Sequence, residues 1–152
     1  HPYLDQNYDF FKHLNQNNKN NSMVKIFPIK GYERNEKIWK KKFGQNVNFA
    51  KTHSPNIYFY KARLVVINDI STPLYELMYI GVPFIIVTDS KFDSYKTGFA
   101  KNLKKLEKLN ILHRCPIKAA KFVNKNYDEI IDWWKVVLKD KNFVQFKTTL
   151  FF

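Results

Sequence analysis

Residues 62–87, ARLVVINDISTPLYELMYIGVPFIIV, contain two short apolar runs separated by a polar turn and an amphipathic segment. The β-branched run 64–67 predicts a parallel strand buried on both faces, and the run 84–87 predicts a second buried strand. Between them, Pro73 is typical of the first turn of a helix, and Gly81 is typical of a helix end. The segment therefore predicts a β-α-β unit with a right-handed crossover.

The flanking sequence continues this alternation of strands and helices. Upstream, we predict a helix, a strand, a helix, a short strand and a helical turn over residues 3–14, 23–29, 33–43, 47–49 and 55–61. The low-complexity run 15–22 predicts a connecting loop. Downstream, we predict four further helices over residues 99–109, 117–124, 127–138 and 143–152. The pattern predicts an α/β fold with a parallel sheet, in one domain over residues 1–152.

Length and cysteine content limit the class of protein. A chain of 152 residues with 45% hydrophobic content can bury one core but cannot hold a two-domain enzyme. No apolar run approaches the roughly 20 residues that a bilayer requires. Cys115 is the single cysteine, which excludes an internal disulfide and favours a reducing cytoplasm. The histidines are not spaced as ligands, so we expect no metal site. Because the first residue is His1, we expect a trimmed chain.

The formal net charge of +13 raises the question of an anionic partner. Nucleic-acid binding is disfavoured because only Arg34, Arg63 and Arg114 are arginine, and the many lysines accompany abundant asparagine, as in an AT-rich coding sequence. A basic face for anionic sugar nucleotides, or for peripheral contact with the inner membrane surface, is the other explanation. Charge alone does not choose between them.

Polar residues follow the first predicted strand of the 62–87 segment. Ligands of open α/β sheets bind beyond the carboxyl ends of the strands, where Asn68 and Asp69 lie. Ser71 and Thr72 open the predicted helix, whose free N–H groups and dipole attract phosphate. Glu76 lies one turn after Thr72 and suits the two hydroxyls of a ribose. The alternative is an ordinary helix cap with a dipole-compensating carboxylate and an Asp69 that caps the turn.

The spacing Thr-x-x-x-Glu-x-x-x-x-Gly-x-Pro, from Thr72 to Pro83, resembles the donor-site motif of GT-B glycosyltransferases. The segments FPIKGYERNEKIWKKKF (27–43) and ILHRCPIKAAKFVNKNYDEIIDWW (111–134) are similar to a transferase family of bacterial surface-carbohydrate (lipopolysaccharide and capsule) gene clusters. The resemblance implies a Rossmann-like three-layer α/β/α sandwich that forms the donor-binding C-terminal half of such an enzyme. Its donor would be a nucleotide-activated sugar, bound without another cofactor.

The same resemblance assigns roles to particular residues. The helix-opening hydroxyls, here Ser71 and Thr72, would face the donor phosphate, and Glu76 would face the ribose. Lys25 stands where the family tends to have arginine, so a bidentate phosphate contact would become a point-charge contact. Lys30 replaces an acidic residue, which weakens a donor role for that loop. The catalytic base would come from an N-terminal acceptor domain that this chain lacks, so we predict donor binding without turnover.

Several other residues have a functional and a structural interpretation. His113 either lines the donor pocket or is a hydrogen-bonded structural histidine, and the latter is favoured. Of the adjacent Trp133 and Trp134, we expect one ring to be buried and one half-exposed. Cys115 lacks a catalytic partner and is predicted to be inert. The rival function is a non-enzymatic basic α/β module that binds nucleic acid or an anionic membrane surface.

Overall fold

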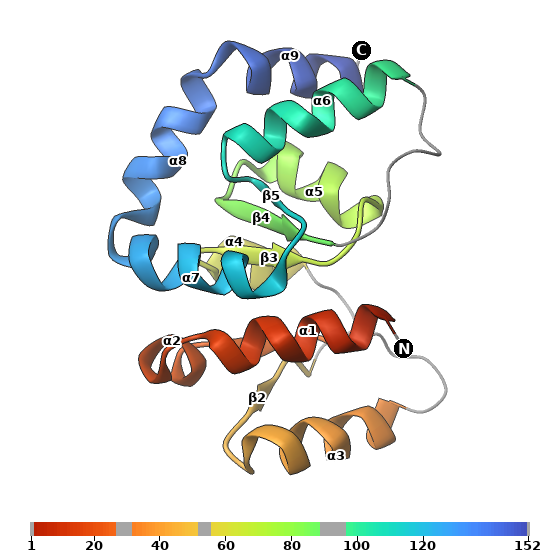
Figure 1. Ribbon diagram of the computed structural model, residues 1–152, viewed down its shortest axis with the longest axis vertical. Coiled ribbons are helices and arrows are strands. Elements are labelled where there is room, and N and C mark those ends of the chain that lie inside the picture. Colours follow the sequence, from red (N-terminus) through yellow and green to blue (C-terminus); the bar gives the residue numbers. More distant parts are fainter. Residues whose placement is uncertain (1, 27–31, 52–55, 89–96, 152) are drawn as a thin grey trace.

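A computed structural model of the chain describes residues 2–26, 32–51, 56–88 and 97–151 (Figure 1). The helices are α1 (Pro2–His13), α2 (Gln16–Asn20), α3 (Tyr32–Phe43), α4 (Asn56–Lys61), α5 (Thr72–Ile80), α6 (Thr97–Lys108), α7 (Pro116–Asn126), the 3-10 turn η2 (Tyr127–Glu129), α8 (Ile130–Lys139) and α9 (Lys141–Phe151). The strands are β1 (Met23–Val24), β2 (Asn48–Phe49), β3 (Val65–Ile67), β4 (Phe84–Val87) and β5 (Leu112–His113).

The strands form two short parallel sheets among the described residues. β1 pairs with β2, and β4 lies between β3 and β5 in the other sheet. Each pair is joined through at least one helix, as parallel strands require. The predicted α/β alternation with parallel pairing is therefore confirmed, although the pairing is divided between two sheets instead of one.

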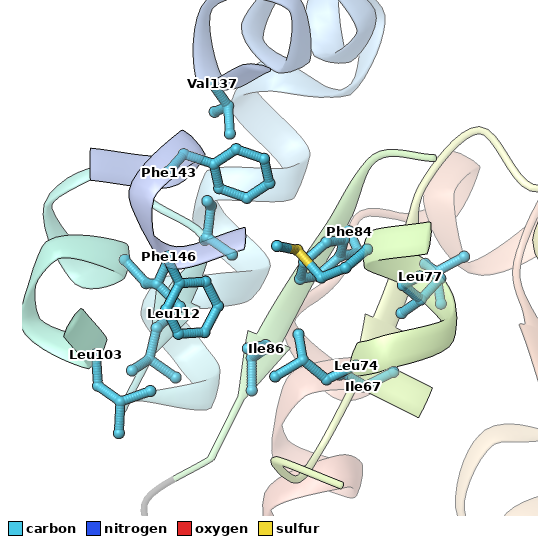
Figure 2. Close-up of a cluster of buried hydrophobic side chains, with 14 of the residues drawn as sticks. Ile67, Leu74, Leu77, Phe84, Ile86, Leu103, Leu112, Val137, Phe143 and Phe146 are labelled. Atoms are coloured by element: carbon cyan, nitrogen blue, oxygen red, sulfur yellow. The ribbon is translucent and has the colours of Figure 1, made fainter. Parts of the chain in front are cut away.

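The central strand β4 is buried on both faces because its side chains alternate between two cores. Phe84 and Ile86 contact residues of α5, α6, α8 and α9, as Figure 2 shows. Ile85 and Val87 point the other way, into a cluster built by α1, α3 and α7. Helices thus pack against opposite faces of β4, and α1 lies between this sheet and α3 in Figure 1.

Helix α5 begins and ends where local chemistry predicts. Pro73 occupies its first turn, and Gly81 closes it in the left-handed conformation with a φ of 83°, which glycine adopts without strain. Leu74 and Leu77 are fully buried, which fixes the rotation of the helix. The indole N–H of Trp134 donates to the Gly81 carbonyl at 2.9 Å. The amino end of α5 is therefore presented by a well-packed helix.

The predicted loop over residues 15–22 is wrong, because it contains helix α2. Asn15 caps this helix, its side chain accepting from the Asn18 N–H at 2.8 Å. Asn124 of α7 accepts from the Asn15 N–H and the Asn18 side chain at 2.9 and 3.1 Å, and donates to the His13 carbonyl at 2.9 Å. A short polar run thus becomes helical because of a partner more than a hundred residues away.

Three further predictions differ from the structure in part, and one strand was not predicted. Strand β3 lies at the edge of its sheet, and it is not buried on both faces, because Val66 is 37% exposed between the buried Val65 and Ile67. Strand β5 was not predicted, because two residues are too few for a periodic signal. The helix predicted over 127–138 is present, but its first three residues form the 3-10 turn η2 and only the remainder is the α-helix α8. The strand predicted over 23–29 is shorter, and residues 27–29 lie outside the described part.

Candidate functional site

The carboxyl ends of β3, β4 and β5 meet at one edge of the three-stranded sheet, because all three strands run parallel. Asn68 follows β3, Thr88 follows β4 and Arg114 follows β5. Thr88 is buried, and its N–H donates to the His113 carbonyl at 3.0 Å. The Arg114 guanidinium pairs with Glu107 of α6. The end of β3 leads into α5, a nine-residue helix whose first residue is exposed.

The turn between β3 and α5 holds Asp69 and Ser71 together. The Ser71 hydroxyl donates to a carboxylate oxygen of Asp69 at 2.9 Å. Ser71 occupies the N-cap position with extended backbone but makes no side-chain bond to the helix amides. The capping alternative is therefore wrong for Ser71, whose proton is directed toward Asp69. The Asp69 carboxylate therefore lies at the positive end of the α5 dipole.

The first turn of α5 offers fewer amides than a typical helix. Pro73 has no N–H, and the Leu74 N–H donates to the Ser71 carbonyl at 2.9 Å. Within the described residues, this leaves the Thr72 N–H without a partner, and the Thr72 side chain is exposed. Glu76 is half-buried one turn farther on, and its carboxylate makes no hydrogen bond or ion pair in that part of the chain. Thr72 and Glu76 are thus the unengaged polar groups of the predicted site.

Helix α1 contributes two residues that the sequence did not indicate. The Gln6 amide donates to the Asn68 carbonyl at 3.4 Å, and the Asn68 amide donates to the Asn7 side chain at 3.4 Å. Gln6 is only 3% exposed. Gln6 lies four residues before Phe10, on the buried stripe of α1. A polar residue among the apolar residues of that stripe was the signal in the sequence that could have identified it. Asn68 is consequently held by hydrogen bonds from α1.

Lys25 is exposed and follows β1, in the two-stranded sheet. Lys25 therefore follows a strand of the two-stranded sheet, whereas the turn after β3 belongs to the three-stranded sheet. Lys30 lies outside the described residues.

The tryptophan prediction is confirmed, and both indoles serve structure. Trp134 is 4% exposed, whereas Trp133 is partly buried and donates to the Leu109 carbonyl at 3.3 Å. The two rings lie 5.7 Å apart and contact other rings of the core, Phe122 on one side and Phe84 on the other. Cys115 occupies the N-cap position of α7 as a partly buried free thiol, and its side chain makes no hydrogen bond to the helix amides.

His113 has structural contacts, which supports the favoured interpretation. Its Nε2 lies 2.7 Å from the Asn110 carbonyl oxygen, and its ring lies 5.2 Å from that of Phe122. Burial lowers the pKa of His113 from its ordinary value of 6.5, and the bond to Asn110 opposes this only in part.

A pH dependence of stability follows from this histidine. Between the lowered folded pKa and the unfolded pKa, the unfolded chain binds more protons, so the free energy of unfolding should decrease as pH falls through that window. We expect His113→Asn to lose part of the decrease seen between about pH 7.5 and pH 5.5. Urea unfolding of both proteins measures the difference. An identical pH profile for the variant would contradict the assignment.

The described residues show neither a metal-binding cluster nor a membrane-spanning helix. No group of three or more His, Cys, Asp or Glu side chains there could hold a metal ion. Among those residues, no helix has the length and apolar character that would let it cross a bilayer.

Comparison with known proteins gives one match. Residues 1–138 match the family model described as LIC12162 family transferase. This match covers both sheets, the turn after β3 and helix α5. No curated protein and no solved structure matches the chain.

Proposed function

The chain belongs to the LIC12162 family of transferases, and from this membership we propose that it binds a nucleotide-activated sugar at the amino end of α5. In this proposal it is a Rossmann-like C-terminal half of a GT-B glycosyltransferase of surface-polysaccharide synthesis, acting in the cytoplasm. The acceptor and the catalytic base belong to a separate N-terminal domain. Family membership supports the transfer chemistry, and the geometry after β3 supports the donor class.

One observation carries the proposal: within the described residues, the side chains of Thr72 and Glu76 have no hydrogen-bond partner, and they lie one turn apart at the carboxyl edge of a parallel sheet. A nucleotide sugar presents a diphosphate and a ribose diol. The Thr72 hydroxyl and N–H can donate to a phosphate oxygen, while the Glu76 carboxylate accepts from the ribose hydroxyls. The diphosphate and the ribose diol of the donor therefore each have a partner of the correct chemistry.

The proposed mechanism is electrostatic. Negative charge grows on the diphosphate as the sugar departs, and the positive end of the α5 dipole with the Thr72 donors stabilises that charge. Lys25, at the carboxyl end of β1, is the proposed point charge toward the phosphate. No catalytic residue is assigned to this chain.

The charge of Asp69 limits where the diphosphate of the donor can be placed. Its carboxylate, bonded to Ser71, repels a diphosphate placed directly on the tip of α5. The same oxygens are good acceptors for sugar hydroxyls. We therefore assign Asp69 and Asn68 to the transferred sugar, with the phosphates displaced toward Thr72.

Calorimetric titration with UDP, CDP and CMP tests the donor site. We expect saturable binding of one of these nucleotides, weakened about tenfold by Glu76→Gln because a charged acceptor for the diol is lost. Thr72→Val should weaken binding about fivefold, whereas Thr72→Ser, which keeps the hydroxyl, should stay within about twofold of the parent. The valine and serine variants form the matched pair.

Asp69→Asn provides a test in the opposite direction. Removing the carboxylate should tighten the binding of free UDP by roughly twofold to fivefold, because repulsion at the helix tip is relieved. A misfolded protein could not bind more tightly. Salt-sensitive binding of any polyanion, unchanged in the Thr72, Glu76 and Asp69 variants, would instead support the rival basic module.

A further inference from the structure

A hollow of about 540 Å³ opens on the α1 and α3 side of the molecule, at a separate place from the tip of α5. Its walls come from α1, the start and end of α2, the last turn of α3 and the residues that lead into β2. Figure 1 shows α1 and α3 as neighbouring helices in the half of the molecule away from α6 and α9. The volume lies within the range of about 300–1,000 Å³ typical of small-molecule sites.

Three ammonium groups and one carboxylate line this hollow: Lys12, Lys19, Lys42 and Asp9. In the described part of the chain, none of the four side chains makes an ion pair. Each lysine lies in the last turn of its helix, where it also offsets a dipole end of roughly half a charge or less. Even after that offset, the hollow keeps an excess of at least roughly half a positive charge.

The floor of the hollow is aromatic and already packed. The Tyr8 and Phe43 rings lie 6.2 Å apart, and the Phe11 and Phe43 rings lie 4.8 Å apart in an edge-on contact. Trp39 contacts Tyr8 from beneath with ring centroids 5.1 Å apart, and the Lys42 ammonium lies 4.9 Å from the Tyr8 centroid. These rings contact one another and the Lys42 ammonium group. They therefore form an apolar floor more than a surface on which a base could stack.

We propose that this hollow binds a phosphate-bearing anion through Lys12, Lys19 and Lys42. A phosphate group offers several oxygens and up to two negative charges, which matches ammonium groups arriving from three separate helices. The apolar floor accepts an aliphatic substituent on the phosphate. The phosphate can belong to a soluble monoester or to the headgroup of an anionic lipid, and both present the same chemistry to the lysines.

The test uses three probes on the full chain. Inorganic phosphate and hexyl phosphate are titrated by calorimetry, and phosphatidylcholine vesicles with or without phosphatidylglycerol are used in a sedimentation assay. We expect hexyl phosphate to bind at least about fivefold more tightly than inorganic phosphate, since its chain covers the apolar floor. The triple variant Lys12→Gln, Lys19→Gln, Lys42→Gln should lose about tenfold or more in affinity.

A charge-matched control separates a site from general attraction. Lys101, Lys104 and Lys108 are exposed on α6, at the opposite end of the molecule in Figure 1. Their replacement by glutamine removes the same net charge and should change affinity by less than about twofold. Equal losses in the two triple variants would overturn the proposal, as would the absence of saturable binding to every probe.

Two further results complete the design. Asp9→Asn removes the one acidic side chain of the lining and should strengthen binding by about twofold to threefold, which no folding defect would produce. Lysine-dependent binding of hexyl phosphate without vesicle binding identifies a soluble ligand. Lysine-dependent binding confined to phosphatidylglycerol vesicles identifies a lipid headgroup. Either pattern supports the site.

Discussion

Replacing Phe84 with alanine is expected to lower the free energy of unfolding by about 3–5 kcal/mol. The side chain is fully buried on β4, and its ring lies 5.3 Å from that of Trp134 in an edge-on contact. Figure 2 shows it between α5 and the C-terminal helices, so its loss leaves a cavity that no single element can close. Because domains of this size are stable by about 5–15 kcal/mol, the variant should unfold at a much lower denaturant concentration.

Tyr79→Ala is the matched control for this prediction. Tyr79 also carries a large aromatic ring, but it is 80% exposed on α5. Alanine favours the helix and leaves no cavity there, so we expect a change within about 0.5 kcal/mol. Guanidinium unfolding followed by circular dichroism measures both variants. Similar midpoints for Phe84→Ala and Tyr79→Ala would show that the described core does not hold the fold together.

Asn124→Leu is expected to lower the free energy of unfolding by about 2–3 kcal/mol. Asn124 joins the end of α1 and the start of α2 to α7 through bonds to the His13 carbonyl, the Asn15 N–H and the Asn18 side chain. Leucine has a similar size but no polar atoms, so Asn18, which is only 7% exposed, would lose its partner. The penalty arises from the unpaired groups left behind.

Asn126→Leu is the corresponding control, two residues farther along α7. Its side-chain amide donates to the Phe122 carbonyl at 2.8 Å, within its own helix and near its end. Losing this local bond should lower the free energy of unfolding by less than about 1 kcal/mol. If the two leucine variants were equally stable, the asparagine cluster would not be the reason that residues 16–20 are helical.

The candidate site depends on the same core that these variants probe. Leu74 and Leu77 fix one side of α5 against the sheet, which leaves Thr72 exposed and Glu76 half-buried. The Trp134 indole holds the other end of the helix at Gly81. A helix anchored in this way presents its first turn in a constant geometry, which is the condition for electrostatic stabilisation without reorganisation.

The amino-acid sequence by itself determined the elements whose signals are local. Pro73 and Gly81 set the ends of α5, and the apolar run at β4 predicted a doubly buried strand, because backbone restriction and side-chain period act within a few residues. The position of Thr72 and Glu76, one turn apart after a strand, followed from the same local rules.

Only the tertiary structure decided features that depend on distant partners. Helix α2 is bound by Asn124 of α7, Asn68 is held by Gln6, and the hydroxyl of Ser71 donates to Asp69 instead of capping its helix. A polar side chain has several possible hydrogen-bond partners, and the sequence does not show which of them folding will bring within 3 Å or so. Burial and partner choice are properties of the packed chain, so they appear only when the helices and sheets are assembled.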